Sequence, residues 1–156
     1  MSSFKVTRHV PYAVEQIFAI AADVASYKEF LPLVKKSVIS DMQQLPDGRS
    51  AFTSDLHFSY KKLGISDVLR SHVTVDPASR TVQSTANEGP VKAMASEWRI
   101  LPGVNGGSDI TFSIDYTLKS RSMQFLLSGM FDLAVRRVMN AFEERAKKLY
   151  GATAAA

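Results

Sequence analysis

The sequence predicts an α+β fold in which a curved antiparallel sheet of about six to seven strands surrounds one long C-terminal helix. Apolar and polar residues alternate through most of the region from 34 to 118, which is the period of a half-buried strand. Hairpin-length connections separate these segments, so neighbouring strands are expected to run antiparallel. Residues 121 to 149 then change to helical spacing and contain no proline. Two short helices are expected after the first strand.

The first elements are a short strand and two helices. Phe4 and Val6 alternate with polar neighbours and indicate the strand. Pro11 ends it and can occupy the first turn of a helix, which helical spacing of apolar residues predicts over 12–24. A second short helix is expected from residue 27, with Phe30 and Leu31 turned inward, because Pro32 disfavours further helix.

A meander of about six strands is predicted next. The candidate strands are 34–43, 52–60, 65–75, 80–86, 94–101 and 110–118. Turn residues separate them at 46–48, 61–64, 76–79, 87–90 and 102–108. Since an antiparallel sheet with one apolar face needs a cover, and the last helix is the longest remaining element, we expect that helix to lie in the curve of the sheet.

The last helix has a broad apolar stripe, which predicts its core-facing side. The stripe comprises Met123, Leu127, Met130, Phe131, Ala134, Val138, Ala141, Phe142 and Leu149. At 1.5 Å per residue the helix could exceed about 40 Å. Gly129 has two interpretations: it lets a ligand or the sheet approach closely, or it is a tolerated helix glycine that costs about 1 kcal/mol.

The predicted inner face of the sheet leaves two interpretations open. It mixes bulky groups with the polar residues Ser54, Asp67, Ser71 and Ser96. Unpaired polar groups in a dry core cost about 1 to 3 kcal/mol each, whereas a cavity with a polar end would tolerate them. Methionines 94, 123 and 130 would suit a flexible apolar ligand. An ordinary filled core with satisfied hydroxyls explains the same residues.

Composition argues against several classes of function. The chain has no cysteine, which excludes disulfides, thiolate metal sites and cysteine nucleophiles. His9, His57 and His72 are scattered, and no hydrolase, zincin or phosphate-loop motif is present, so no catalytic or metal-ligating residue is proposed. Asp67 and Arg70 fall on opposite faces of one strand, which speaks against an acid–base pair.

Charge and hydropathy bear on partners and location. The net charge of +4 includes the basic pairs 35–36, 61–62, 136–137 and 147–148, which could contact anionic lipid or ribosomal RNA or simply be solvated. No apolar run reaches the roughly 18 to 20 residues of a membrane-spanning helix. We expect a cytoplasmic protein that can lie at the periphery of the inner membrane and that binds no DNA. Residues 1–150 are expected to form one domain, followed by a disordered tail over 151–156.

Three segments resemble a known family. Residues 27–32 resemble the Tyr-x-x-Phe-(Leu/Val)-Pro signature of the coenzyme Q-binding START-domain family, part of the START-like polyketide cyclase/lipid transport superfamily. Residues 89–92 followed by Trp98 resemble its Gly-Pro-Phe-Lys…Trp segment, and 141–146 resemble its (Ala/Cys)-Phe-Glu-x-Arg-Ala segment. The chain departs from the pattern at Leu33-Val34, where many relatives have Trp-Cys, and at Val91, where Phe is usual.

The resemblance implies a helix-grip fold with a central apolar cavity that binds ubiquinone or a related isoprenoid lipid. The expected role is a non-enzymatic carrier or chaperone that supports respiration and requires no cofactor. A ribosome-association toxin that interferes with subunit joining is the alternative, and a cyclase-like enzyme is a weaker one. The residues expected to line the cavity are Phe30, Leu31, Pro32, Phe52, Leu56, Phe58, Leu69, Val73, Met94, Trp98, Phe112, Ile114, Tyr116, Met123, Leu127, Met130, Phe131, Ala134 and Val138.

Two loops have alternative roles in this scheme. Residues 30–32 could form a lid at the cavity mouth or a hydrophobic plug at one end of the barrel. The 87–90 loop could form a second edge of the mouth or be a plain strand connection. Arg145 suits the C-terminal end of the helix dipole, which favours a structural role for it.

Overall fold

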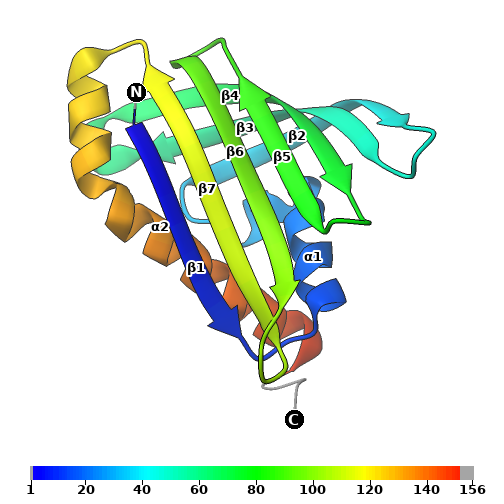
Figure 1. Cartoon of the computed structure of the whole chain (residues 1–156). Coiled ribbons are helices and arrows are strands. Elements are labelled where there is room, and N and C mark those ends of the chain that lie inside the picture. The colour runs from blue at the N-terminus through cyan, green and yellow to red at the C-terminus, as the bar shows by residue number, and fades with distance from the viewer. Residues whose placement is uncertain (1, 152–156) are drawn as a thin grey trace.

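A computed structural model describes residues 2–151, apart from the side chains of residues 63, 131 and 132. Seven strands form one sheet: β1 (Ser2–Val10), β2 (Val34–Gln44), β3 (Ser50–Tyr60), β4 (Ile65–Asp76), β5 (Thr81–Ala86), β6 (Val91–Pro102) and β7 (Ser108–Leu118). Their order is β1-β7-β6-β5-β4-β3-β2, and every neighbouring pair is antiparallel. Each turn from β2 to β7 therefore connects spatial neighbours, and β1 joins the far edge. The predicted meander is confirmed (Figure 1).

The helices after β1 differ in detail from the prediction. α1 (Val14–Ala22) buries Ile17 and Phe18 and packs on α2 and on the sheet. The second helix is the 3₁₀ helix η1 (Val24–Glu29), which begins three residues earlier than expected. It ends before Phe30 rather than at Pro32, and Phe30 N–H bonds back to the carbonyl of Tyr27. A further 3₁₀ turn, η2 (Lys61–Leu63), joins β3 to β4 and ends at Gly64, whose φ is 64°.

The long helix is α2 (Arg121–Tyr150), and its predicted length is confirmed. Its 30 residues span roughly 45 Å. Ser120 caps it, with Oγ accepting a hydrogen bond from the Met123 N–H at 3.2 Å. Figure 1 shows α2 crossing the sheet diagonally, with its first half standing beyond the sheet margin and its second half beside α1.

The core-facing side of α2 is rotated from the predicted stripe along its second half. The buried residues there are Val135, Met139, Phe142 and Ala146, of which the predicted stripe contained Phe142. Leu149, expected on the core side, is 50% exposed. The difference arises because α1 packs against this part of α2 from one side of the sheet, a contact that helical spacing alone does not reveal.

One half of the interior is tightly packed around Phe142. The Phe142 ring stacks on Trp98 with centroids 4.4 Å apart, and Phe30 and Tyr27 meet it edge-on at 5.4 and 6.2 Å. Burial raises the pKa of Tyr27, which therefore stays neutral and donates to the Ala21 carbonyl.

The buried hydroxyls of the inner face lie with this packed half. Ser54 is 1% exposed, has no hydrogen-bond partner among the described residues, and sits on β3 between Phe52 and Leu56. Ser71, 5% exposed, lies opposite Ser54 on the neighbouring strand β4. The idea that these two serines mark a polar end of a cavity is therefore wrong.

Candidate functional site

The other half of the interior is hollow. A cavity of about 660 Å³ lies between the sheet and the first half of α2. Its lining is mainly apolar and comes from the η1–β2 connection, β3, β4, the β5–β6 loop, β6, β7 and α2. The volume falls within the roughly 300–1,000 Å³ typical of small-molecule pockets.

The structure brings most of the predicted site residues together around this cavity. Those in its lining are Pro32, Phe58, Leu69, Met94, Ile114, Tyr116, Met123, Leu127, Met130, Ala134 and Val138. That they contact a ligand stays a prediction. The side chain of Phe131 lies outside the described part of the chain.

Seven predicted lining residues belong instead to the packed core. These are Phe30, Leu31, Phe52, Leu56, Val73, Trp98 and Phe112. The physical reason is that β3, β4, β6 and β7 each run through both halves of the interior. Residues on one face of such a strand point the same way but have different neighbours. On β3, Phe52 packs in the core, whereas Phe58, six residues further on, lines the cavity.

Several further lining residues fall outside the set expected to line the cavity, although Asp67 was placed on the inner face and the 87–90 loop was a candidate edge of the mouth. The additional ones are Leu33, Tyr60, Ile65, Asp67, Gly89, Pro90, Val91, Leu118, Lys119, Ser120, Leu126, Leu133 and Arg137. Tyr60 and Ile65 continue the apolar faces already recognised on β3 and β4. Leu126 and Leu133 fall outside the predicted stripe, although an apolar arc wider than the usual stripe between residues 123 and 134 is visible in the sequence and could have indicated them.

The segment after η1 is divided between the packed core and the cavity lining, so the choice between a lid and a plug stays a prediction. Phe30 belongs to the aromatic cluster that closes the packed half, as a plug would. Pro32 and Leu33 line the cavity and are exposed, as an edge of the mouth would be. Leu33 has φ 73°, a left-handed conformation that is rare for a branched residue, and its carbonyl accepts a hydrogen bond from Ser59.

The β5–β6 loop forms another edge of the cavity. Gly89 and Pro90 both line it. The Pro90 carbonyl accepts a hydrogen bond from the backbone N–H of Lys119, which fixes the loop to the start of α2. Gly89 has φ 69°, and a Cβ there would lie 3.0 Å from the Val68 carbonyl, so glycine suits this turn.

Few charged groups touch the cavity. Asp67, Lys119 and Arg137 are the charged residues in its lining, and all three are exposed. Asp67 Oδ1 accepts a hydrogen bond from the Val68 N–H at 2.7 Å. Inside, Tyr116 is 3% exposed and its hydroxyl lies 3.2 Å from Ser128 Oγ. The cavity thus offers an apolar interior with polar groups at its margin.

Arg70 lies away from the cavity, although it neighbours Asp67 in sequence. Its guanidinium donates two hydrogen bonds to Asp55, each 2.8 Å long. These bonds, together with the positive charge of Arg70, hold the pKa of Asp55 below its usual range. Within residues 2–151, no group of three or more histidine, cysteine, aspartate or glutamate side chains could hold a metal ion.

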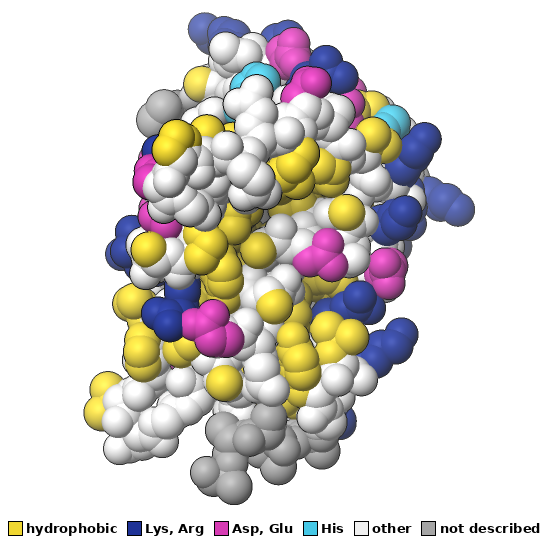
Figure 2. All heavy atoms as spheres, turned by 90° about the vertical axis from the view of Figure 1, so that its right-hand side faces the viewer, with side chains coloured by type: hydrophobic (Ala, Val, Ile, Leu, Met, Phe, Trp, Pro, Cys, Tyr) yellow, Lys and Arg dark blue, Asp and Glu magenta, His cyan; other side chains and the backbone are white. Residues whose placement is uncertain are grey.

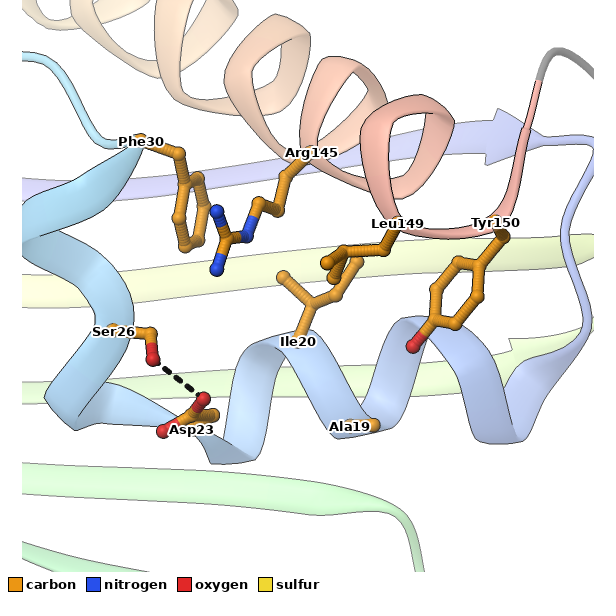
Figure 3. A pocket seen from close by; sticks show the side chains of 8 residues that line it. All are labelled: Ala19, Ile20, Asp23, Ser26, Phe30, Arg145, Leu149 and Tyr150. Atoms are coloured by element: carbon orange, nitrogen blue, oxygen red, sulfur yellow. Dashed lines mark hydrogen bonds between the residues drawn. The ribbon is translucent and has the colours of Figure 1, made fainter.

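A second, smaller pocket of about 150 Å³ lies between α1, η1 and the end of α2. Figure 3 shows Arg145 beside the Phe30 ring, with Asp23 and Ser26 across the pocket. The Arg145 guanidinium is 5.3 Å from the Phe30 ring centroid and 3.3 Å from the Glu29 carboxylate. Arg145 thereby ties the end of α2 to η1, which agrees with the structural role expected for it.

The outer surface carries both hydrophobic and basic groups. Figure 2 shows hydrophobic side chains gathered over the middle of one face, with Lys and Arg concentrated along one side of it. Among the described residues, no helix is long and apolar enough to cross a membrane.

The sequence is similar to one protein family and to several characterised proteins. Residues 10–143 match the family described as "Polyketide cyclase / dehydrase and lipid transport". The chain is 27% identical to ribosome association toxin RatA of Rickettsia prowazekii, over 96% of this chain and 99% of that protein. It is 26% identical to the mitochondrial coenzyme Q-binding protein COQ10 homolog B of Xenopus laevis, over 90% of this chain but 56% of that longer protein.

Solved structures share the fold. The 18 kDa protein CC1736 of Caulobacter crescentus superposes with a TM-score of 0.83 at 24% identity, over 97% of this chain and all of that one. The ZhuI aromatase/cyclase of Streptomyces superposes with a TM-score of 0.75 at 20% identity, over 98% and 99%. At these identities the likeness concerns the fold alone.

Proposed function

This chain belongs to the polyketide cyclase/dehydrase and lipid transport family, and from that premise we propose that it binds a hydrophobic small molecule in the 660 Å³ cavity. The cavity is the observation that carries the proposal. Burial of an apolar ligand contributes roughly 25 cal/mol per Å² of surface removed from water. The exposed Asp67, Lys119 and Arg137 leave room for a polar head at the margin.

For the ligand we propose ubiquinone or another isoprenoid lipid. The likeness to a protein named for coenzyme Q binding supports this class. The methionines of the lining support it too, since Met94, Met123 and Met130 give a wall that adapts to a flexible chain. In this role the protein carries or shields the lipid, and the chemistry is binding alone.

A ribosome-directed role is the second candidate, and the comparisons favour it over quinone carriage in respiration. The relative named ribosome association toxin matches over nearly its whole length, whereas the coenzyme Q-binding relative matches over about half of its own. The two roles are compatible, because one uses the cavity and the other an outer surface. A cyclase-like activity has the shared fold as its support.

The test of ligand binding starts with the purified protein. Extraction with organic solvent and mass spectrometry should identify a bound quinone or other lipid, and the stripped protein should bind it again. Ala134→Trp places a large ring in the cavity lining and should abolish rebinding. The matched control is Val104→Trp, at a residue 96% exposed in the β6–β7 loop.

Different results would contradict the ligand-binding proposal and the ribosome-directed role. Absence of any extracted lipid together with absence of rebinding contradicts the proposal, as does full binding by a folded Ala134→Trp protein. If that variant does not fold, Met130→Trp provides the same test from another lining position. Sedimentation of a cell lysate tests the ribosome role separately: the protein should travel with a ribosomal subunit at low salt, and recovery at the top of the gradient contradicts that role.

A further inference from the structure

The first half of α2 presents large apolar side chains to solvent. Phe125 is 85% exposed, Leu133 54% and Leu126 38%. At about 3.6 residues per turn these three and Gly129 fall on one side of the helix. We call Phe125, Leu126, Gly129 and Leu133 the α2 stripe. The α2 stripe lies on the first half of the helix, which Figure 1 shows standing beyond the margin of the sheet.

The second half of the same helix carries charged residues on this side. Five turns of helix are about 18 residues, so the equivalents of Phe125, Leu126 and Gly129 are Glu143, Glu144 and Lys147. Charged residues therefore take the places of Phe125, Leu126 and Gly129. Glu144 and Lys147 are exposed, and Glu143 is half-buried with an oxygen 3.8 Å from the Arg8 guanidinium. The fold does not require the stripe to be apolar, so an explanation outside the packing of this chain is needed.

The α2 stripe is continuous with the mouth of the cavity. Leu126 and Leu133 are exposed and at the same time line the cavity, and Met130 between them lines it too. Leu33, 40% exposed and likewise in the lining, contributes a further apolar group from the η1–β2 connection. A surface pressed against the stripe would therefore cover the opening through which a ligand passes.

The charges near this mouth are mostly positive. Lys119 and Arg137 are exposed members of the lining, and Lys61 and Lys62 are exposed in η2, between the lining residues Tyr60 and Ile65. Asp67 in the lining and Glu88 in the β5–β6 loop are the acidic residues beside them. Exposed leucine and phenylalanine flanked by lysine and arginine fit an anionic membrane surface, into which the rings and chains insert while the cations meet head groups.

We propose that the α2 stripe and the cations of η2 form a docking surface for a lipid bilayer with anionic head groups. Docking there holds the cavity mouth against the membrane, so that a hydrophobic ligand moves between bilayer and cavity without crossing water. This inference rests on the proposed ligand-binding function. RNA would be met by the same cations, and a base could stack on Phe125, but the exposed Leu126 and Leu133 beside it offer no stacking surface and favour the bilayer.

The test is co-sedimentation of the full chain with vesicles of phosphatidylcholine, with and without phosphatidylglycerol. The wild-type protein should bind the anionic vesicles and not the neutral ones. Phe125→Ser should weaken that binding severalfold, and Lys61→Gln with Lys62→Gln should weaken it by about fivefold per cation. None of these residues lines the cavity. The matched controls are Val104→Ser for the apolar change and Lys147→Gln with Lys148→Gln for the charge change, all at exposed positions.

Equal vesicle binding by Phe125→Ser and wild type overturns the proposal, as does wild-type binding to ribosomal RNA but to neither vesicle. Equal binding to neutral and anionic vesicles overturns it too, since the cations then have no part. Ligand binding measured in solution without vesicles should be unchanged in Phe125→Ser. Failure of ligand binding in the wild type would count against the proposed function, and loss of vesicle binding alone against the docking surface.

Discussion

Phe142 anchors the packed half of the interior. It is fully buried and stacks on Trp98 while Phe30 and Tyr27 meet its edge. Phe142→Ala should lower the free energy of unfolding by about 3 to 5 kcal/mol, because it leaves a cavity among rings that cannot collapse together. Urea denaturation followed by circular dichroism measures this. Phe125→Ala, the same change at an exposed position of the same helix, should stay within about 0.5 kcal/mol of wild type. Equal losses in both variants would contradict the assignment.

Individual residues show where sequence reasoning ends. Alternation correctly indicates that Phe52 and Phe58 share a face of β3, because that depends on the strand period alone. Which of them meets packed rings and which meets empty space depends on where α1 and α2 cross the sheet. That crossing is a property of the assembled chain, so the sequence placed Trp98 and Phe112 at the cavity although they pack in the core.

At the scale of elements, a substitution at Gly129 in α2 should stabilise the protein, in contrast to Phe142→Ala. Gly129 is exposed, it is not among the residues that line the cavity, and a Cβ built on it would meet nothing within 4 Å, so the packing of the chain does not require glycine there. Gly129→Ala should therefore raise the free energy of unfolding by about 0.5 to 1 kcal/mol, since alanine loses less backbone freedom in a helix. Thermal or urea denaturation tests this. Gly89→Ala, at a position with φ 69° and the Val68 carbonyl 3.0 Å away, should destabilise instead.

Long periodic elements were predictable and short ones were not. β7 and α2 have sustained alternation and helical spacing, and both were found close to their observed bounds. η1 is too short for a periodic signal, and it begins at Val24, directly after the single non-helical residue Asp23 that ends α1. Pro32, which was expected to end that helix, lies beyond its end and lines the cavity.

At the scale of the whole molecule, ligand binding should be coupled to stability. A ligand that binds the folded chain and not the unfolded one adds about 2.7 kcal/mol at a concentration of 100 times its Kd. The purified protein should thus lose thermal stability when its lipid is stripped and regain it on reconstitution. Differential scanning fluorimetry measures both steps. Ala134→Trp, which obstructs the cavity with a large ring, should show a much smaller difference, and a shift equal to that of wild type would place the ligand elsewhere.

The hollow itself could not be predicted from the residues. Seven strands, one apolar face and a long covering helix permit either a filled core or an empty one, and the inner-face serines that hinted at a cavity are buried in the packed half. The expectation of a cavity came from the resemblance to a family. The structure shows where the cavity lies, between the sheet and the first half of α2, and gives its volume of about 660 Å³.

The division of the interior has a consequence for how such a chain can change over time. The aromatic cluster around Phe142 holds α1, η1 and α2 on the sheet at one end. Substitutions at the other end, among Met94, Leu127 and Met130, alter the shape of the cavity while leaving those contacts in place. Selection can thus adjust what the chain recognises without first having to rescue its folding. One scaffold divided in this way can give rise to descendants with unrelated cargoes.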